Sequence, residues 1–193
     1  MSSSDTRERI LTAARKLLEE RAWAGVGLGE VARAAGVSRQ AIYLHFGSRA
    51  ALLLALVDYV DEVEGLSELV ARVEDASSGA EQLDRLAWLN SVYEPRIRSV
   101  VIAHDAARRH DADLEEAWQD RMERRRGLYR RTVRRLEAEG ALAAGLTRKD
   151  AVDLMWALLG PRVHEDLVSD RGWSARRYET HMRTVLRGAL ARR

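Results

Sequence analysis

The stretch AGVSRQAIYLHFGSR, residues 35–49, predicts two short helices joined by a tight turn. Gly36 stands where a helix commonly ends, because glycine adopts the left-handed backbone conformation of a C-terminal cap without strain. Ser38 follows as the N-cap of the next helix, since its hydroxyl can accept a hydrogen bond from a first-turn N–H group. Gly47 ends that helix after little more than two turns. This order is typical of a helix-turn-helix.

Further helices are predicted on both sides of this pair. Asp5 and Glu8 have the spacing of a capping pair, and apolar residues follow at helical spacing from Ile10. Glycines within residues 23–27 break this first helix, and a second helix covers roughly residues 29–35. The small side chains of that second helix allow a close, steep crossing with its neighbour.

One face of the helix after Ser38 carries long polar side chains. Arg39, Gln40 and Tyr43 lie at positions i, i+1 and i+4, so they share that face. In a helix-turn-helix, the outward residues of the second helix enter the major groove of DNA. Arg39 suits a guanine edge and Gln40 suits an adenine edge, so both are predicted to contact bases.

Other residues nearby suit the phosphate backbone rather than the bases. Ser38, Tyr43, His45 and Arg49 carry hydroxyl, imidazole or guanidinium groups that can donate to phosphate oxygens, and we predict positioning contacts for them. Leu44 could touch a thymine methyl group or pack inside the protein, and packing is the favoured interpretation. Ser48 caps a fourth helix that runs to about residue 64.

Residues 27–58, GLGEVARAAGVSRQAIYLHFGSRAALLLALVD, resemble the N-terminal DNA-binding domain of TetR-family transcriptional regulators. The matching elements are AGVS, IYLHF and the serine-plus-basic pair that opens the fourth helix. Two residues depart from the family pattern. Gly29 stands where many members carry a polar residue, so a hydroxyl-to-phosphate contact is absent. Arg49 replaces a more common lysine and keeps the charge.

The resemblance implies an all-α fold with two parts. Residues 1–50 are expected to form a three-helix helix-turn-helix domain that binds DNA. Residues 51–193 are expected to form a helical bundle for ligand binding and dimerisation. The first 50 residues hold eight basic and five acidic residues, and such a positive surface suits a phosphate backbone.

Composition limits the other classes of protein. The chain has 193 residues and no cysteine, which excludes disulfides and thiolate metal sites. Its N-terminus is polar, unlike a signal peptide, and its longest apolar run, residues 50–57, is too short to cross a bilayer. We expect a cytoplasmic protein with no membrane contact and no cofactor.

The C-terminal part is predicted to be helical throughout. A capping pair begins at Ser78, and Pro95 starts or kinks the following helix. A long helix ends at Gly140. Thr147 caps a helix that runs to about Val168, and a last helix begins near residue 174.

A set of aromatic, sulfur and histidine side chains in this part invites two interpretations. Such residues usually belong to an ordinary core. In the family that the chain resembles, however, the C-terminal helices enclose a pocket for a small-molecule effector. The candidate ligand-binding residues are Trp88, His104, Trp118, Met122 and Trp156.

Two apolar stripes near the C-terminus predict a homodimer. They carry more apolar surface than a small core could hide, and a twofold four-helix interface would bury it. One helix-turn-helix also contacts too few base pairs to be specific, so a second copy is required. The predicted interface residues are Met155, Leu158, Leu159, Met182, Val185, Leu186 and Leu190.

Two further patterns are interpreted as surface. The histidines and aspartates of residues 104–113 could suggest a metal site, but His104 and His110 do not share a helix face, so an ion-paired helix end is favoured. The basic run of residues 124–135 is interspersed with acidic residues, which is typical of a salt-bridged exposed face. No catalytic motif occurs, so an enzyme is not expected.

The sequence therefore predicts a transcriptional regulator, specifically a repressor on a palindromic DNA operator. An unidentified small molecule would release it by tilting the fourth helix and so changing the separation of the two reading helices. An activator, or a regulator of this fold without a ligand, remains an alternative. A helical enzyme or ligand carrier is the other class left open.

Overall fold

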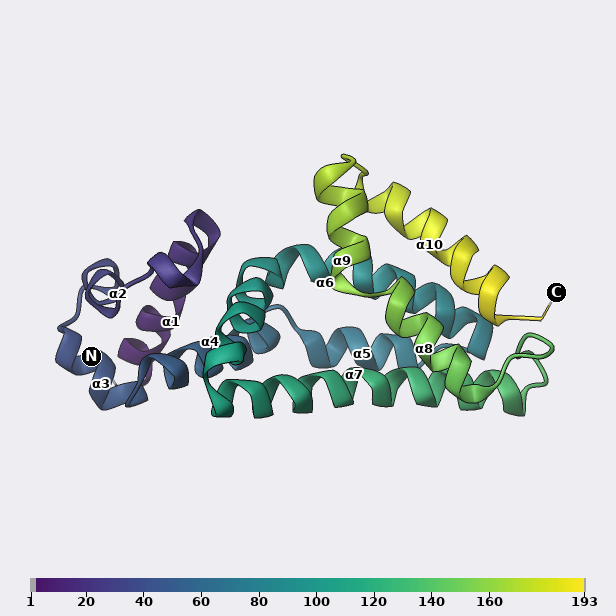
Figure 1. The fold of residues 1–193 in the computed structure, drawn as a ribbon, viewed down its shortest axis with the longest axis horizontal. Helices are drawn as coiled ribbons and strands as arrows, with labels where there is room; N and C mark the ends of the chain where they lie inside the picture. The colour runs from purple at the N-terminus through teal and green to yellow at the C-terminus, as the bar shows by residue number, and fades with distance from the viewer. Residues whose placement is uncertain (1–2, 193) are drawn as a thin grey trace. The chain divides into compact units, whose positions relative to one another are not determined.

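The computed structural model describes residues 3–192 and confirms an all-α fold (Figure 1). Its α-helices are α1 (Ser3–Glu20), α2 (Leu28–Ala35), α3 (Arg39–Phe46), α4 (Arg49–Val63), α5 (Leu66–Glu74), α6 (Gly79–Ala107), α7 (Ala112–Ala138), α8 (Arg148–Leu158), α9 (Pro161–His164) and α10 (Ala175–Leu190). Among residues 3–192, no single helix is long and apolar enough to cross a bilayer. The helices α3 and α4 reach that composition only as a pair bent by 70°.

The chain forms two compact units. One comprises the residues up to Glu64 together with Ile97–Asp120, and the other comprises Gly65–Arg96 and the chain from Arg121 onward. The first unit includes α4 because that helix packs against α1 and α3. The ion pair of Arg15 with Glu64, 2.6 Å, also joins α1 to the C-terminal end of α4. The division into functional domains at residue 50 stays a prediction.

The first unit has a core of aliphatic side chains contributed by α1 to α4. Small residues at the crossing of α2, Ala32 and Ala35, are nearly completely buried, as their predicted role requires. The helix α1 begins at Ser3, so Asp5 lies in its first turn and is not the N-cap that was predicted. The fully or almost fully buried residues include Ile10, Leu11, Ala14, Val31, Ile42, Leu52, Leu53 and Leu56.

The turn between α2 and α3 has the geometry that its glycine and serine predict. Gly36 lies at φ +64°, its N–H donates to the Arg33 carbonyl at 3.2 Å, and the Val37 N–H donates to the Ala32 carbonyl at 2.9 Å. These two bonds form a Schellman cap. The Ser38 hydroxyl accepts from the Ala41 N–H at 3.1 Å, which confirms the predicted N-cap of α3.

Replacing Gly36 by alanine is expected to lower the free energy of unfolding by about 1–2 kcal/mol, because a residue with a Cβ is strained at this φ. The added Cβ would also lie 3.1 Å from the Arg9 guanidinium. Gly29→Ala is the matched control, since it lies within α2 and its Cβ would meet nothing within 4 Å. This control should gain about 0.5 kcal/mol. Urea unfolding followed by circular dichroism measures both, and equal effects would contradict the strain.

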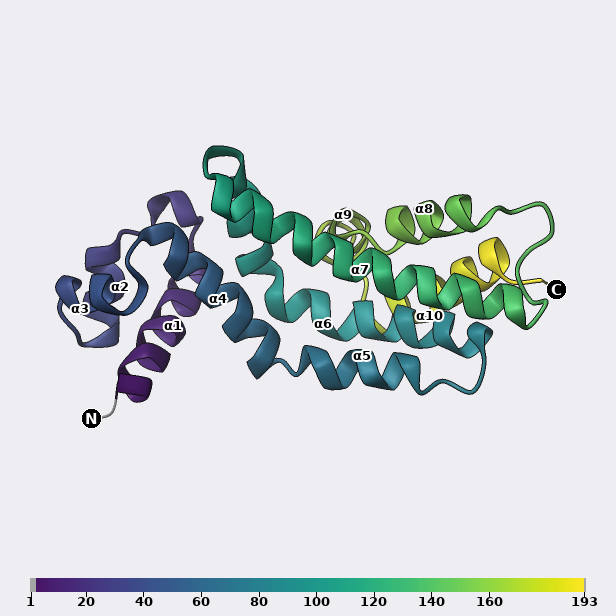
Figure 2. The same cartoon turned by 90° about the horizontal axis from the view of Figure 1, so that it is seen from below.

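The second unit packs α8 and α10 against each other and around the adjoining parts of α5, α6 and α7 (Figures 1 and 2). The helix α6 continues through Pro95, which excludes a helix start there, and the alternative, a kink at Pro95, stays a prediction. The helix α8 ends at Leu158, well before the predicted Val168. Gly160 and Pro161 explain this end, because proline lacks the N–H that the helix would need and instead opens α9.

Most of the side chains predicted for a dimer interface lie in the core of this second unit. The two stripes face each other within one chain, so the argument that they exceed what the core can hide is wrong. Val185 is 43% exposed and Leu158 is half-buried, and these two remain available at the surface. The five core residues are Met155, Leu159, Met182, Leu186 and Leu190, each at most 4% exposed.

A buried ion pair crosses the second unit. The Arg125 guanidinium lies 3.2 Å from the Glu94 carboxylate, and their side chains are 20% and 9% exposed. Arg125 also donates to the Tyr129 hydroxyl at 2.7 Å and to the Leu159 carbonyl at the end of α8. One guanidinium therefore joins α6, α7 and α8.

A second set of hydrogen bonds extends this pair to α10. The Asn90 side-chain amide donates to the Leu159 carbonyl at 3.0 Å, and the Tyr178 hydroxyl donates to the Asn90 amide oxygen at 2.5 Å. Burial raises the pKa of Tyr178, and Glu94 raises it further. Burial likewise raises the pKa of Tyr129, although Arg125 acts in the opposite direction.

These raised tyrosine pKa values predict a loss of stability in alkali. Below about pH 10 the hydroxyls keep their protons in both states. Above it the unfolded chain loses protons that the folded chain retains, so the free energy of unfolding falls by up to about 1.4 kcal/mol per pH unit per tyrosine. Urea unfolding at pH 9 and pH 10.5 measures the fall. Tyr178→Phe should show a smaller one, and an identical fall would contradict this assignment.

The basic run of α7 is mainly a salt-bridged surface, as predicted. Arg131 pairs with Glu74 at 2.7 Å and Arg135 pairs with Glu139 at 2.9 Å. Arg125 is the exception, because its side chain points into the second unit and pairs with Glu94. Its place within a run of basic residues does not reveal this.

Candidate nucleic-acid interface

The helix α3 has one buried and one exposed side. Ile42 is 1% exposed and seats the helix on its neighbours, whereas Arg39 and Gln40 point to solvent. Tyr43 is 44% exposed and Leu44 is 81% exposed. The interpretation that Leu44 packs inside the protein is therefore wrong. Because α3 has few residues, one buried position per turn is enough to anchor it, and Leu44 falls on the outer side.

Arg39 and Tyr43 form a contact one turn apart along α3. The Arg39 guanidinium donates to the Tyr43 hydroxyl at 3.2 Å, and its Cζ atom lies 5.7 Å from the centroid of the Tyr43 ring. This contact restricts a long side chain before any ligand binds. A restricted guanidinium loses less conformational entropy when it forms hydrogen bonds.

The residues predicted to contact phosphates differ in how many contacts they already make within the protein. The Ser38 hydroxyl oxygen accepts from Ala41, and its proton remains able to donate to a phosphate. The ring of His45 is half-buried, with its centroid 6.1 Å from that of Phe46. Ser48 caps α4 through the Ala51 N–H at 3.0 Å.

Arg49 lies against the first unit instead of extending into solvent. Its guanidinium stacks 4.6 Å from the Trp23 ring centroid and donates to the Trp23 carbonyl. This contact ties the start of α4 to the segment between α1 and α2. The structure therefore favours a role for Arg49 in positioning α4, and its contact with phosphate stays a prediction.

A surface groove of about 660 Å³ brings several of these residues together. Arg39, Tyr43 and Arg49 line it beside the N-terminus of α2. Glu30 contributes a negative charge, which Arg21 neutralises at 2.8 Å. The Gly27 N–H, at 3.0 Å, and Arg21 hold the pKa of Glu30 below its usual range. Cationic and hydroxyl donors at a helix N-terminus suit a backbone phosphate.

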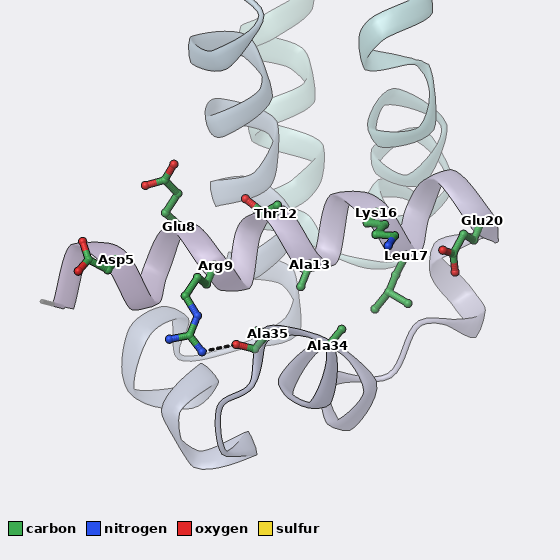
Figure 3. Close-up of a pocket in the computed structure, with 10 residues that line it drawn as sticks. All are labelled: Asp5, Glu8, Arg9, Thr12, Ala13, Lys16, Leu17, Glu20, Ala34 and Ala35. Carbon is green, nitrogen blue, oxygen red and sulfur yellow. Dashed lines mark hydrogen bonds between the residues drawn. The ribbon is translucent and has the colours of Figure 1, made fainter. Parts of the chain in front are cut away.

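Arg9 is a positioning residue that the sequence pattern does not reveal. Its guanidinium donates to the Ala35 carbonyl (Figure 3) and, at 3.1 Å, to the Gly36 carbonyl. The charge satisfies carbonyl groups at the C-terminus of α2, where a cation is favourable. Arg9 lies in a second groove, of about 790 Å³, between α1 and α2. It fixes α1 against the turn that orients α3.

The predicted effector-binding residues divide between the two units. In the first unit, the His104 Nε2 atom lies 2.8 Å from the Leu114 carbonyl, and its ring packs edge-on against Trp118 at 5.3 Å. In the second unit, Arg126 stacks on Trp156 at 4.3 Å and Met122 is 8% exposed. These contacts are those of packed side chains. Trp88 is half-buried, and Arg72 stacks on its ring at 5.7 Å.

The ion-paired helix end predicted for residues 104–113 is found in part. Asp105 pairs with Arg108 at 2.8 Å. His104, however, is 1% exposed and is not part of that surface. Within the part of the chain that the structure describes, no three histidine or carboxylate side chains cluster as metal ligands.

The tight turn between α2 and α3 and the exposed polar face of α3 are features of the helix-turn-helix found in DNA-binding proteins. Residues 10–56 match the family described as bacterial regulatory proteins, tetR family. The transcriptional regulator EthR of Mycobacterium tuberculosis is 31% identical over 125 residues, which are 63% of this chain and 57% of that protein. The match thus spans less than two thirds of that relative.

Solved structures agree over the whole fold. A putative transcriptional regulator from Saccharomonospora viridis, solved in complex with choline, has a TM-score of 0.84 at 20% identity and covers 98% of this chain and all of that one. NalD, the secondary repressor of a multidrug efflux pump in Pseudomonas aeruginosa, has a TM-score of 0.73 at 25% identity over 100% of this chain and 98% of its own. The TetR-family match is thus confined to residues 10–56, and the likeness to these regulators over the rest of the chain is one of fold.

Proposed function

We propose that the protein is a DNA-binding transcriptional repressor that acts as a homodimer on a palindromic operator in the cytoplasm. The observation that carries this proposal is the exposed face of α3, with Arg39, Gln40 and Tyr43 held outward while Ile42 is buried. The TetR-family match of residues 10–56 supports DNA binding, and the repressor NalD supports the direction of regulation. The match to a regulator family also weighs against an enzyme.

The dimer surface is proposed to lie on the outward sides of α8 and α10. Leu154 is 38% exposed and Val185 is 43% exposed, with Leu158 half-buried between helix and solvent. These residues give a smaller apolar patch than the sequence predicted. Val185→Arg should weaken the dimer without touching the core, and sedimentation velocity of the full chain measures it. If Val185→Arg dimerises as strongly as the unaltered chain, the interface does not include this patch.

An effector is proposed to release the DNA by favouring a conformer in which α4 is tilted. A ligand can shift this equilibrium only through its different affinities for the two conformers. The S. viridis regulator, solved in complex with choline, supports a small-molecule site in a protein of this fold. An activator, or a regulator without a ligand, is the alternative.

Selection of genomic fragments by the full chain tests the proposal. The selected fragments should share a palindrome, and their affinity should fall by about 10³-fold or more between about 50 and 200 mM salt, because phosphate contacts release counterions. Fluorescence anisotropy with the selected duplex measures this slope. Binding to no duplex, or binding that is insensitive to salt, would overturn the proposal.

A further inference from the structure

An exposed leucine on the helix that meets DNA requires an explanation. Leu44 is 81% exposed, the largest exposure of any large apolar side chain recorded among residues 3–192. It follows Gln40 by four positions on a helix that continues from Arg39 to Phe46, so the two side chains occupy the same face. Tyr43 beside it is already bonded to Arg39. The outer face of α3 therefore presents an amide and an isobutyl group one turn apart.

Leucine cannot contribute to the contacts that fix a protein on the DNA backbone. Those contacts require donors for phosphate oxygens, and Leu44 has none. In the major groove, the base edges display donors and acceptors together with a single apolar group, the C5-methyl of thymine. An apolar side chain that enters this groove and covers that methyl group makes the free energy of binding more favourable.

We propose that Leu44 is a specificity-determining residue that reads a thymine methyl group within each operator half-site. This inference rests on the proposed DNA-binding function and names a base that the site selects. Four residues of helix rise about 6 Å, while successive base pairs rise about 3.4 Å. The thymine therefore lies one or two base pairs from the base that Gln40 contacts.

Uracil differs from thymine only by lacking this methyl group, so it tests the proposal without altering any hydrogen bond. Each thymine of one half-site of the selected operator is replaced in turn by uracil, and affinity is measured by anisotropy at fixed salt. For the unaltered full chain, one position should lose about fourfold, the effect expected for one buried methyl group. The other positions should lose little.

The same scan on variants of Leu44 assigns the effect to that side chain. Leu44→Ala should bind the thymine and uracil forms equally at that position. Because Leu44 is exposed, the variant should keep the stability of the unaltered chain. Leu44→Met keeps an apolar side chain of similar size and should retain the uracil penalty. A flat scan for the unaltered chain, or an unchanged penalty in Leu44→Ala, overturns the inference. Loss of all salt-dependent duplex binding would instead contradict the proposed function itself.

Discussion

Arg125→Met is expected to lower the free energy of unfolding by about 3–5 kcal/mol, because it leaves the Glu94 carboxylate buried without its cation. The Glu94 side chain is 9% exposed and cannot recover water at its present position. The same substitution removes a donor from the Tyr129 hydroxyl and from the Leu159 carbonyl. Burial lowers the pKa of Arg125, but Tyr129 and Glu94 raise it, and the net direction is upward. The guanidinium is therefore charged at every ordinary pH.

Arg124→Met is the matched control for this substitution. Arg124 precedes Arg125 on α7 and is exposed, so its loss should change stability by no more than about 0.5 kcal/mol. Urea unfolding of both variants supplies the comparison. The double variant Arg125→Met with Glu94→Met should be less destabilised than the sum of its single changes, since neither charge is then left alone. If Arg125→Met behaves like Arg124→Met, the pair contributes nothing to the fold.

The ends of most helices were predictable from the sequence because their causes are local. The hydroxyls of Ser38 and Ser48 each cap an N–H three residues ahead, and Gly36 supplies a left-handed cap. Thr147 caps α8 and Ser174 caps α10 in the same way. A capping bond joins residues that are neighbours in sequence, so one sequence is sufficient to reveal it.

The role of each apolar stripe was less predictable because it depends on distant partners. A stripe shows that a helix buries one face, but the partner can be the same chain or a second copy. Met155 and Leu186 belong to the same hydrophobic core within one chain, and this could not be deduced from their spacing. The predicted helix was also too long, because α8 ends at Leu158 and not near Val168.

Charged residues were the hardest to assign. Arg125 stands in a run of exposed arginines, and only the fold shows that it meets Glu94 across the core. Arg49 was assigned to phosphate by its position, yet it packs on Trp23. Arginine side chains are long and can extend in several directions, so the sequence does not show which partner either of these two residues contacts. The exposed face of α3, in contrast, could be predicted from helical periodicity alone. The residues proposed to read bases, Arg39 and Gln40, therefore lie at the surface as expected.

Arg39→Ala is expected to weaken operator binding by about 2–6 kcal/mol when both half-sites are affected, since a bidentate contact to guanine contributes about 1–3 kcal/mol of discrimination. The loss should be confined to operators that carry the guanine which Arg39 contacts. Duplexes altered at that one base pair should bind the unaltered chain and the variant almost equally. Anisotropy with the operator and its single-base variants measures this difference at one salt concentration.

Arg39→Lys distinguishes base reading from simple attraction to phosphate. Lysine keeps the charge but lacks the planar fork that matches the two acceptors of guanine. It also cannot reproduce the stacking of the guanidinium on Tyr43, whose ring centroid lies 5.7 Å from the Arg39 Cζ atom. Arg39→Lys should therefore preserve the salt dependence of binding while losing most of the discrimination at that base pair. A phosphate contact predicts the reverse: lysine would substitute well, and Arg39→Ala would weaken all duplexes equally with a shallower salt slope.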